Sequence, residues 1–348
     1  MSKLANVLAL PDKPRAFGYW VNGDWVNGND MVERLSPGHG VPVTLVPRCT
    51  VQDLNAAVAA ARTAFENRSW SGLSGAERAG VLLRIAEILR RRRDEIAYWE
   101  VLENGKPISQ ARGEIDHCIA CFETGAGAAR LLHGDSFNSL GDNLFGMVLR
   151  EPVGVVGLIT PWNFPFLILC ERVPFILASG CTLVVKPSEV TSATTLLLGE
   201  ILSEAGLPKG VYNVVTGSGQ VIGDALAKHP DVDMVSFTGS TSVGRSVVHS
   251  SADSNFKKLG LELGGKNPII VFADANLEEA ADGAAFGISF NTGQCCVSSS
   301  RLIVERKIAR EFEEILAAKM KKIIVGDPLD EATQIGAITT AAQNETIM

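Results

Sequence analysis

The spacing of apolar residues divides the chain into two regions with different predicted secondary structure. Before residue 133, apolar residues recur at helical spacing and predict three helices, at 50–66, 74–104 and 109–132. Capping-box sequences at Thr50 and Ser74 mark the starts of the first two. Residues 1–50 mix Pro, Gly and Asn with short apolar pieces, so we expect an extended arm with turns there rather than a core element.

From residue 151 onward, short apolar runs alternate with stretches of helical length and composition. The runs predict strands at 153–159, 181–185, 211–215, 232–237 and 268–272. Because they lack polar alternation, we expect a parallel sheet that is covered by helices on both faces. The predicted fold is therefore a doubly wound α/β domain, whose ligands bind beyond the carboxyl ends of its strands. Residues 134–150, rich in Gly, Ser, Asn and Asp, predict a hairpin or arm.

Composition indicates a soluble globular protein and excludes several function classes. The 348 residues are 46% hydrophobic and 20% charged, enough for about two domains. The formal net charge of −7 gives no electrostatic reason to bind nucleic acid or anionic lipid, and we interpret the basic run Arg90 to Arg93 as a solvated helix face. No apolar stretch approaches the ~18 residues that span a membrane, and the N-terminus lacks the apolar core of a signal peptide. We expect a cytoplasmic protein.

The seven cysteines include one candidate nucleophile. Their odd number does not indicate a disulfide framework, so a reducing compartment is expected. Cys170 and Cys181 lie in apolar segments typical of the core. Cys118 and Cys121 form a lone C-x-x-C within a helical stretch, with no second pair to complete a zinc site, so we expect core residues and no metal. Cys296 differs, because its loop is polar and contains glycine.

A carboxylate precedes this cysteine at a suggestive position. Glu262 lies 296 − 262 = 34 residues before Cys296. A thiolate is the nucleophile that adds to carbonyl groups, and a nearby carboxylate can deprotonate a thiol or a water molecule. The five histidines are scattered, so no Cys/His dyad is indicated.

Two polar motifs directly follow predicted strands. After 153–159, the turn around Asn163 contains two prolines; it is either a rigid loop or the source of a fixed amide donor for an oxyanion. After 181–185 come Lys186 and Glu189. Lys186 either emerges into solvent or, with Glu189, grips a ribose, the lysine donating to hydroxyls and the glutamate accepting from the 2′-OH.

Two glycine-containing segments are candidates for holding a phosphate. Gly217, Gly219 and Gly223 form a relaxed loop whose spacing is not G-x-G-x-x-G, so the signal is weak. Residues 237–244 end a strand and open a helix, where free backbone N–H groups and the Ser240 hydroxyl could bind a phosphate. Ordinary capping by Ser or Thr explains the same segment equally well.

In their order and spacing, five motifs resemble the NAD(P)-dependent aldehyde dehydrogenase superfamily: TPWNFP, VVKPSE, FTGSTSVG, LELGGK and FNTGQCC. The resemblance covers essentially the whole chain. Within the superfamily, the chain resembles the betaine-aldehyde and broad-specificity bacterial members. It implies a Rossmann-like α/β cofactor domain, a β-hairpin arm and the beginning of a second α/β catalytic domain. The implied boundaries are 1–133 and 153–261 for the NAD-binding domain, 134–152 for the oligomerisation arm and 262–348 for an incomplete catalytic domain.

The resemblance also implies roles for individual residues. Cys296, rather than Cys295, is similar to the family nucleophile because the pattern is G-Q-x-C, while Glu262 resembles the general base and Asn163 the oxyanion-hole amide. The implied cofactor contacts are Ile159, Thr160, Pro161, Trp162, Lys186, Ser188, Glu189, Gly219, Gly223, Phe237, Gly239, Ser240, Val243 and Leu263.

The implied reaction oxidises a small-molecule aldehyde to a carboxylate with NAD. The Cys296 thiolate adds to the aldehyde, the thiohemiacetal loses a hydride to the nicotinamide, and Glu262 activates water against the resulting thioester. Glu189 favours NAD over NADP, because a carboxylate disfavours a 2′-phosphate. Glu262 favours water over coenzyme A as the acyl acceptor, since a carboxylate base suits hydrolysis.

The chain ends before the family's E-I-F-G-P motif, whose glutamate holds the nicotinamide ribose, so the resemblance implies a C-terminally truncated protein. Two function classes stay open at this point. One is an aldehyde dehydrogenase, and the other is a catalytically dead remnant that only binds the dinucleotide. Family members form homo-oligomers through an arm like 134–152, and the assembly of this chain also stays open.

Overall fold

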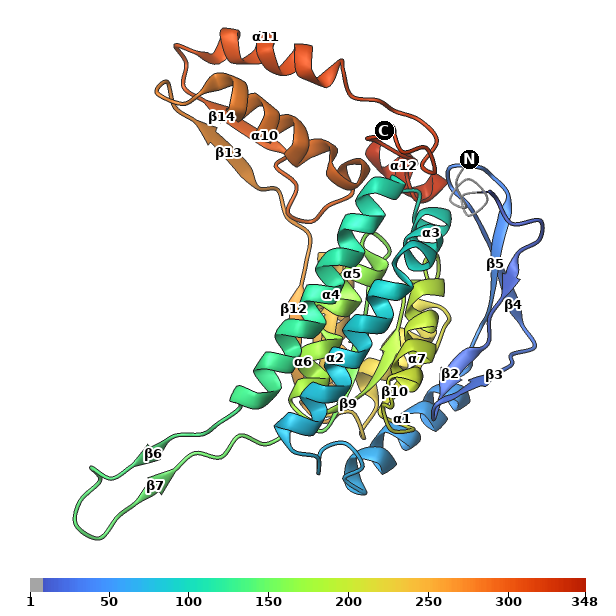
Figure 1. The fold of residues 1–348 in the computed structure, drawn as a ribbon, viewed down its shortest axis with the longest axis vertical. Coiled ribbons are helices and arrows are strands. Elements are labelled where there is room, and N and C mark those ends of the chain that lie inside the picture. The colour runs from blue at the N-terminus through green and yellow to red at the C-terminus, as the bar shows by residue number, and fades with distance from the viewer. Residues whose placement is uncertain (1–8) are drawn as a thin grey trace.

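A seven-stranded sheet forms the centre of the computed structural model, which describes residues 9–348 (Figure 1). The strand order is β12-β11-β8-β9-β10-β2-β3. The first five strands in this order pair in parallel, β2 pairs antiparallel to β10, and β3 pairs antiparallel to β2. Their bounds are β12 Lys258–Glu262, β11 Met234–Thr238, β8 Val155–Ile159, β9 Thr182–Lys186, β10 Tyr212–Val214, β2 Tyr19–Val21 and β3 Asp24–Val26. Strands β8 and β9 are buried at every position, which explains their lack of polar alternation.

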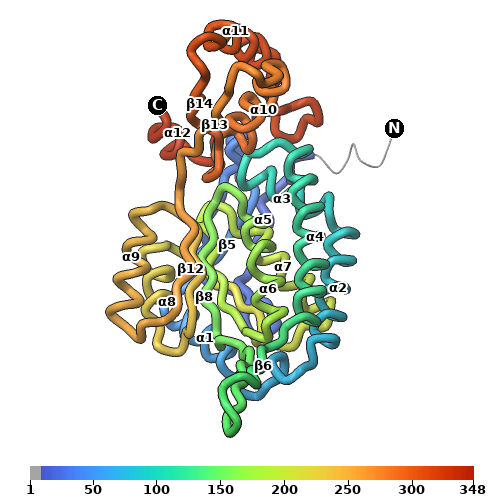
Figure 2. The backbone as a smooth tube through the Cα atoms, turned by 90° about the vertical axis from the view of Figure 1, so that its left-hand side faces the viewer, coloured from blue at the N-terminus to red at the C-terminus, as the bar shows by residue number. Residues whose placement is uncertain are grey.

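Helices cover both faces of this sheet (Figure 2). One face carries α1 (Val51–Glu66), α8 (Asp224–Lys228) and α9 (Thr241–Ala252). The other carries α5 (Pro165–Cys170), α6 (Val173–Ala178) and α7 (Ala193–Glu204), with α2 (Gly75–Arg91), α3 (Arg93–Asn104) and α4 (Ile108–Leu131) packed outside them. The predicted doubly wound α/β fold is confirmed. The four cysteines predicted to be core residues are buried: Cys118, Cys121, Cys170 and Cys181.

The prediction of one helix over 74–104 is wrong, because the chain breaks it at Arg92. This residue leaves helical geometry (φ −99°, ψ 12°), and its guanidinium bonds to Glu95 in the first turn of α3 (2.7 Å). The apolar spacing continues across the break, so the sequence carries no signal for it. The start at Ser74 is a true capping box: Ser74 and Glu77 exchange hydrogen bonds.

The basic run Arg90 to Arg93 lies where these two helices meet, and each of its guanidinium groups contacts at least one carboxylate. The partners come from α2, α3, α4 and α7: Glu87, Glu95, Asp116, Glu123, Glu200 and Glu204. The positive charges of the run are therefore compensated by carboxylates of the helices that pack around it.

Residues 17–46 contribute side chains to the core, so the prediction of an arm over 1–50 is wrong for this part, while residues 1–8 lie outside the described residues. Strands β2 and β3 form a hairpin around Asn22 and Gly23, both at positive φ (55° and 79°), and β2 pairs with β10 at the sheet edge. Trp20 packs so closely on α7 that a Cβ at Gly199 would lie 2.7 Å from its ring. Strands β1 (Arg15–Ala16), β4 (Met31–Leu35) and β5 (Pro42–Pro47) make a second small sheet.

The prediction also placed 268–272 in the central sheet, and this is wrong. That segment is β13 (Pro268–Val271), which pairs with β14 (Arg301–Val304) in a separate parallel sheet, whereas the edge strand of the central sheet is β12, which the sequence reading missed. Partial exposure along β12, with Lys258 and Glu262 at its ends, hides it from an apolar-run criterion. The β13–β14 sheet lies with α10 (Leu277–Ser289) and α11 (Ala309–Met320). The last helix of the chain is α12 (Ala341–Ile347).

Between α4 and β8 the chain forms a hairpin that projects from the body (Figure 1). Its strands are β6 (Ser136–Phe137) and β7 (Gly146–Met147). The loop exposes Leu144 and Phe145, with 65% and 66% of their surfaces accessible. This hairpin is the β-hairpin arm expected for 134–150.

Candidate active site

The order of strands places a crevice beside β8. From β8 the chain proceeds to β9 and β10 on one side, while β11 and β12 lie on the other, so the direction of winding reverses between β8 and β11. Ligands of open α/β sheets bind at the carboxyl ends of the strands next to this reversal. The segments that follow Ile159 and Thr238 are therefore the structurally favoured place for a site.

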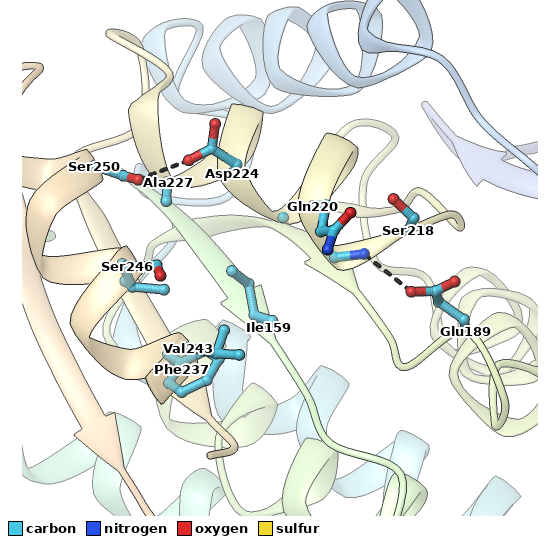
Figure 3. Close-up of a pocket in the computed structure, with 13 residues that line it drawn as sticks. Ile159, Glu189, Ser218, Gln220, Asp224, Ala227, Phe237, Val243, Ser246 and Ser250 are labelled. Atoms are coloured by element: carbon cyan, nitrogen blue, oxygen red, sulfur yellow. Dashed lines mark hydrogen bonds between the residues drawn. The ribbon is translucent and has the colours of Figure 1, made fainter. Parts of the chain in front are cut away.

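A cavity of about 630 Å³ opens between η2 (Gly219–Gly223), a π-type turn leading into α8, and the facing helix α9 (Figure 3). Six predicted cofactor contacts line it: Ile159, Glu189, Gly219, Gly223, Phe237 and Val243. Neither glycine would bring a Cβ within 4 Å of another atom, so any side chain there would occupy open space. Sequence reasoning missed seven further lining residues: Ser218, Gln220, Asp224, Ala227, Ser246, Val247 and Ser250.

Glu189 is fixed at the rim of this cavity. Its carboxylate accepts a hydrogen bond from the backbone N–H of Gly219 (3.1 Å), as Figure 3 shows. On the opposite side the Ser250 hydroxyl donates to Asp224 (2.7 Å). The cavity thus combines apolar side walls with a carboxylate acceptor at one end, a chemistry suited to an aromatic base joined to a ribose.

Lys186 ends β9 as a buried residue, only 4% exposed, and does not emerge into solvent. Burial lowers its pKa to about 8, against the opposing effect of Glu189. Within residues 9–348 the structure gives its Nζ no hydrogen-bond or ion-pair partner. Lys186, Ser188 and Thr160 lie outside the walls of both cavities described here, and Thr160 Oγ1 is buried without a partner. The Lys186 ammonium group is therefore buried without a partner among the described residues, and it can donate hydrogen bonds to a ligand.

A second cavity of about 280 Å³ lies across the ends of β8, β11 and β12. It brings together Pro161, Trp162, Asn163, Gly239, Ser240, Leu263 and Cys296. At its margin α9 begins: the Ser240 hydroxyl accepts from Val243 N–H (3.3 Å), and the other N–H groups of the first turn have no helical acceptor. Such a helix start favours an anion. The two cavities therefore form neighbouring parts of one site.

Asn163 is tied to the loop that carries the cysteines. Its Nδ2 donates to the carbonyl of Gln294 (2.9 Å), while its own carbonyl accepts from Asn291 Nδ2 (2.7 Å). The second N–H of the Asn163 amide has no protein acceptor in the part of the chain that is described. Asn104 Nδ2 also holds the carbonyl of Trp162 (2.8 Å). These contacts fix a side-chain amide at the wall of the cavity that Cys296 lines.

Cys295 and Cys296 differ in their surroundings, although both line the second cavity. Burial raises the pKa of Cys295, which keeps this thiol protonated. The carbonyl of Cys296 lies against Gly265, where a Cβ would be 2.9 Å from the oxygen. A side chain at position 265 would displace Cys296, so the glycine of the LELGGK motif has a packing role.

Glu262 is the one proposed catalytic residue that lines neither cavity. It ends β12 as an exposed residue, and its backbone carbonyl accepts from Gly239 N–H (3.0 Å). Its neighbour Leu263 lines the second cavity, but the Glu262 side chain does not. The exposed carboxylate therefore lies outside the walls of both cavities.

The structure adds residues that sequence reasoning missed in the cysteine loop. Asn291 and Thr292 have left-handed φ angles (52° and 57°), which are costly for residues other than glycine. Gln294 is buried, and its Oε1 accepts from Thr339 N–H (3.0 Å). The Asn-Thr-Gly turn sequence was the one available signal for this geometry.

Between residues 9 and 348, no three His, Cys, Asp or Glu side chains gather as a metal ion would require. Over the same range, no helix has both the length and the apolar character needed to cross a bilayer.

Comparison with known proteins gave consistent matches. The family model described as "Aldehyde dehydrogenase family" matches residues 25–348. Betaine aldehyde dehydrogenase 1 of Oryza sativa subsp. japonica is 40% identical over 350 residues, which cover 98% of this chain and 69% of that protein. A crystal structure of NAD-dependent aldehyde dehydrogenase from Sinorhizobium meliloti matches with a TM-score of 0.94 and 49% identity, covering 95% of this chain and 66% of that one.

A structure of indole-3-acetaldehyde dehydrogenase complexed with NAD+ matches with a TM-score of 0.94 and 37% identity, covering 99% of this chain and 70% of that one. The chain thus spans about two thirds of the length of the proteins that it matches.

Proposed function

Since this chain belongs to the aldehyde dehydrogenase family, we propose that it takes part in the oxidation of an aldehyde to a carboxylate, with NAD as the hydride acceptor. The observation that carries the proposal is the second cavity, where Cys296 and the Asn163 amide share one wall at the end of the dinucleotide crevice. In this proposal 1–133 and 153–261 bind NAD, 262–348 supply the nucleophile, and 134–152 serve assembly.

The residues present fit NAD chemically. The 630 Å³ cavity offers apolar walls for the adenine, Glu189 an acceptor for ribose hydroxyls, and the start of α9 an anion site for the pyrophosphate. Lys186 supplies a buried cation without a protein partner near Glu189. Bound in this crevice, the cofactor would supply a nicotinamide ring that accepts a hydride.

Each proposed catalytic residue has a separate task. The Cys296 thiolate attacks the aldehyde carbon, and the Asn163 amide donates to the oxygen as it gains negative charge. Loss of hydride from this adduct leaves a thioester on Cys296. Glu262, next in the chain to Leu263 of the second cavity, takes a proton from the water that attacks the thioester and so releases the carboxylate.

The direct test uses the purified 348-residue chain with NAD and a small aliphatic aldehyde, followed by the absorbance of NADH. We expect NADH to accumulate only when both compounds are present. Folded chain that binds NAD but forms no NADH would overturn the catalytic proposal and leave dinucleotide binding as the function. Acyl-CoA formation when coenzyme A is added would overturn water as the acceptor.

The carboxylate of Glu189 is expected to set the preference for NAD over NADP. In Glu189→Gln the side chain can still accept the Gly219 N–H, but the charge that repels a 2′-phosphate is gone. We expect the ratio of kcat/KM for NADP to that for NAD to rise by about tenfold, a change of about 1.4 kcal/mol. Glu313→Gln, on the exposed side of α11, is the matched control. A wild-type chain that uses NADP better than NAD would contradict the assignment.

Lys186 is expected to make NAD binding depend on pH. Because burial lowers its pKa to about 8, the ammonium is lost as the pH rises through this value, and the Kd for NAD should increase with it. Lys186→Met should weaken binding at neutral pH by about tenfold to a hundredfold and flatten the dependence, since a hydrogen bond to a charged group is lost. Calorimetric titration across this pH range measures both effects. Equal pH dependence in wild type and variant would rule out Lys186 as the titrating group.

A further inference from the structure

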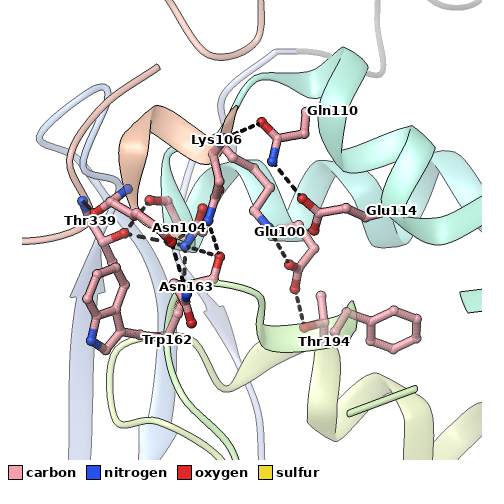
Figure 4. Close-up of polar contacts among 12 residues, drawn as sticks. Glu100, Asn104, Lys106, Gln110, Glu114, Trp162, Asn163, Thr194 and Thr339 are labelled. Carbon is pink, nitrogen blue, oxygen red and sulfur yellow. Dashed lines mark hydrogen bonds and ion pairs between the residues drawn. The ribbon is translucent and has the colours of Figure 1, made fainter. Parts of the chain in front are cut away.

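A buried ionic cluster lies behind the cysteine loop (Figure 4). Lys106 is completely buried, with its Nζ 2.5 Å from Glu114 and 3.6 Å from Glu100. The same ammonium lies over the ring of Phe164, 4.7 Å from its centroid. Charges taken out of water are costly and stabilise little, so a group of this kind is better explained by the geometry that it enforces.

The cluster fixes the orientation of one amide, that of Gln110. Its Nε2 donates to the second oxygen of Glu114 (2.8 Å), as Figure 4 shows. A carboxylate held by a lysine only accepts, so the NH₂ end of Gln110 must face it. The Gln110 oxygen is thereby turned outwards, where it accepts the backbone N–H of Asn291 (3.0 Å).

Asn291 connects the oriented Gln110 amide to the proposed active site. Its left-handed backbone (φ 52°) requires support from its surroundings. With its N–H held by Gln110, its side chain donates to the carbonyls of Asn163 (2.7 Å) and Gln294 (3.1 Å). One residue therefore joins the loop that carries the amide to the loop that carries the cysteine.

The geometry points to Gln110 as a positioning residue: oriented by the Lys106–Glu114 pair, it acts through Asn291 to hold Cys296 and Asn163 in register. This inference rests on the proposed function of the same site. It explains why polar groups from α3 and α4, more than 170 residues earlier in the chain, are buried beside the cysteine loop.

The first test compares Gln110→Met, which keeps the volume but removes both hydrogen bonds, with Thr194→Val. Thr194 donates to Glu100 (2.6 Å) in the same cluster, and its hydroxyl makes no hydrogen bond to either loop within the described residues. In a Cys295→Ala background, we measure the rate at which iodoacetamide alkylates Cys296. We expect a change of at least threefold for Gln110→Met and none for Thr194→Val. Equal rates in all three proteins, or equal changes in both variants, would overturn the inference.

The second test asks whether Gln110 acts through Asn291. Gln110→Met is expected to lower kcat by about tenfold to a hundredfold, with the KM for NAD within about twofold of wild type. The double variant Gln110→Met/Asn291→Ala should be no worse than Asn291→Ala alone. Additive losses would contradict the pathway. If Gln110→Met does not fold, Gln110→Asn, one methylene too short, should give an intermediate loss.

The alkylation readout needs neither NAD nor turnover. A chain that forms no NADH but still shows the change in alkylation rate would refute the proposed catalysis and support the positioning role. If the wild-type chain forms NADH, and Gln110→Met changes neither the alkylation rate nor kcat, the proposed catalysis is supported and the positioning role of Gln110 is refuted.

Discussion

Replacing Cys296 by alanine is expected to abolish aldehyde-dependent NADH formation, a loss of at least about 10⁴-fold, because the covalent route then lacks its proposed nucleophile. Cys295→Ala, the matched control next to it, should keep activity within about threefold of wild type, since burial raises the pKa of the Cys295 thiol and keeps it protonated.

The measurement is the initial rate of NADH formation for wild type and both variants, with circular dichroism to show equal folding. Intact-mass analysis during turnover should reveal an acyl adduct in wild type and in Cys295→Ala but not in Cys296→Ala. Substantial activity in Cys296→Ala, or loss of activity in Cys295→Ala alone, would place the nucleophile at the other position.

Removing the charge of Lys106 is expected to destabilise the fold by about 3–5 kcal/mol, since Lys106→Met leaves Glu100 and Glu114 buried without a cation. Burial already raises the pKa of Glu100. In the variant the Glu100 carboxyl group also loses the cation that opposes this shift, so it binds a proton more tightly in the folded state than in the unfolded one. The lost stability should therefore be partly recovered as the pH is lowered and should be largest at alkaline pH.

Urea unfolding at several pH values measures this effect. The control is Lys209→Met, which removes a lysine 2.7 Å from Asp24 at the surface, where both side chains are 66% exposed. That change should cost no more than about 1 kcal/mol. Equal losses in the two variants would show that burial of the Lys106 cluster adds nothing to its effect.

Sequence patterns predicted the parts of the site that follow strand ends. Asn163, Ser240 and Cys296 lie in segments that come after apolar runs or in a glycine-containing loop, and sheet topology brings two of these segments to one edge. The fold class was predictable because β8 and β9, which are buried at every position, show no alternation of apolar and polar residues.

The remaining parts depend on contacts that no local pattern contains. Gln110 and Asn291 are separated by 181 residues, and neither position is unusual in its own segment. Lys186 follows an apolar strand as a solvent-facing lysine would, but the structure buries it. The β2–β3 hairpin did have a local signal, Asn22-Gly23 between YWV and DWV, and the abundance of turn residues around it favoured the wrong interpretation.

The pairing of β2 with β10 has a consequence for the order of events during synthesis. Trp20 is opposite Val214, 214 − 20 = 194 residues later in the chain. At ribosomal speeds of about 5–20 residues per second, β2 waits roughly 10–40 s before its partner has been made. Until then the β2–β3 hairpin of the nascent chain has an unpaired strand edge and exposed aromatic side chains. Such edges bind chaperones and can pair with other chains during aggregation. The first strand of the central sheet to be translated therefore pairs early with β3 but joins the parallel strands only after β8, β9 and β10 have been made.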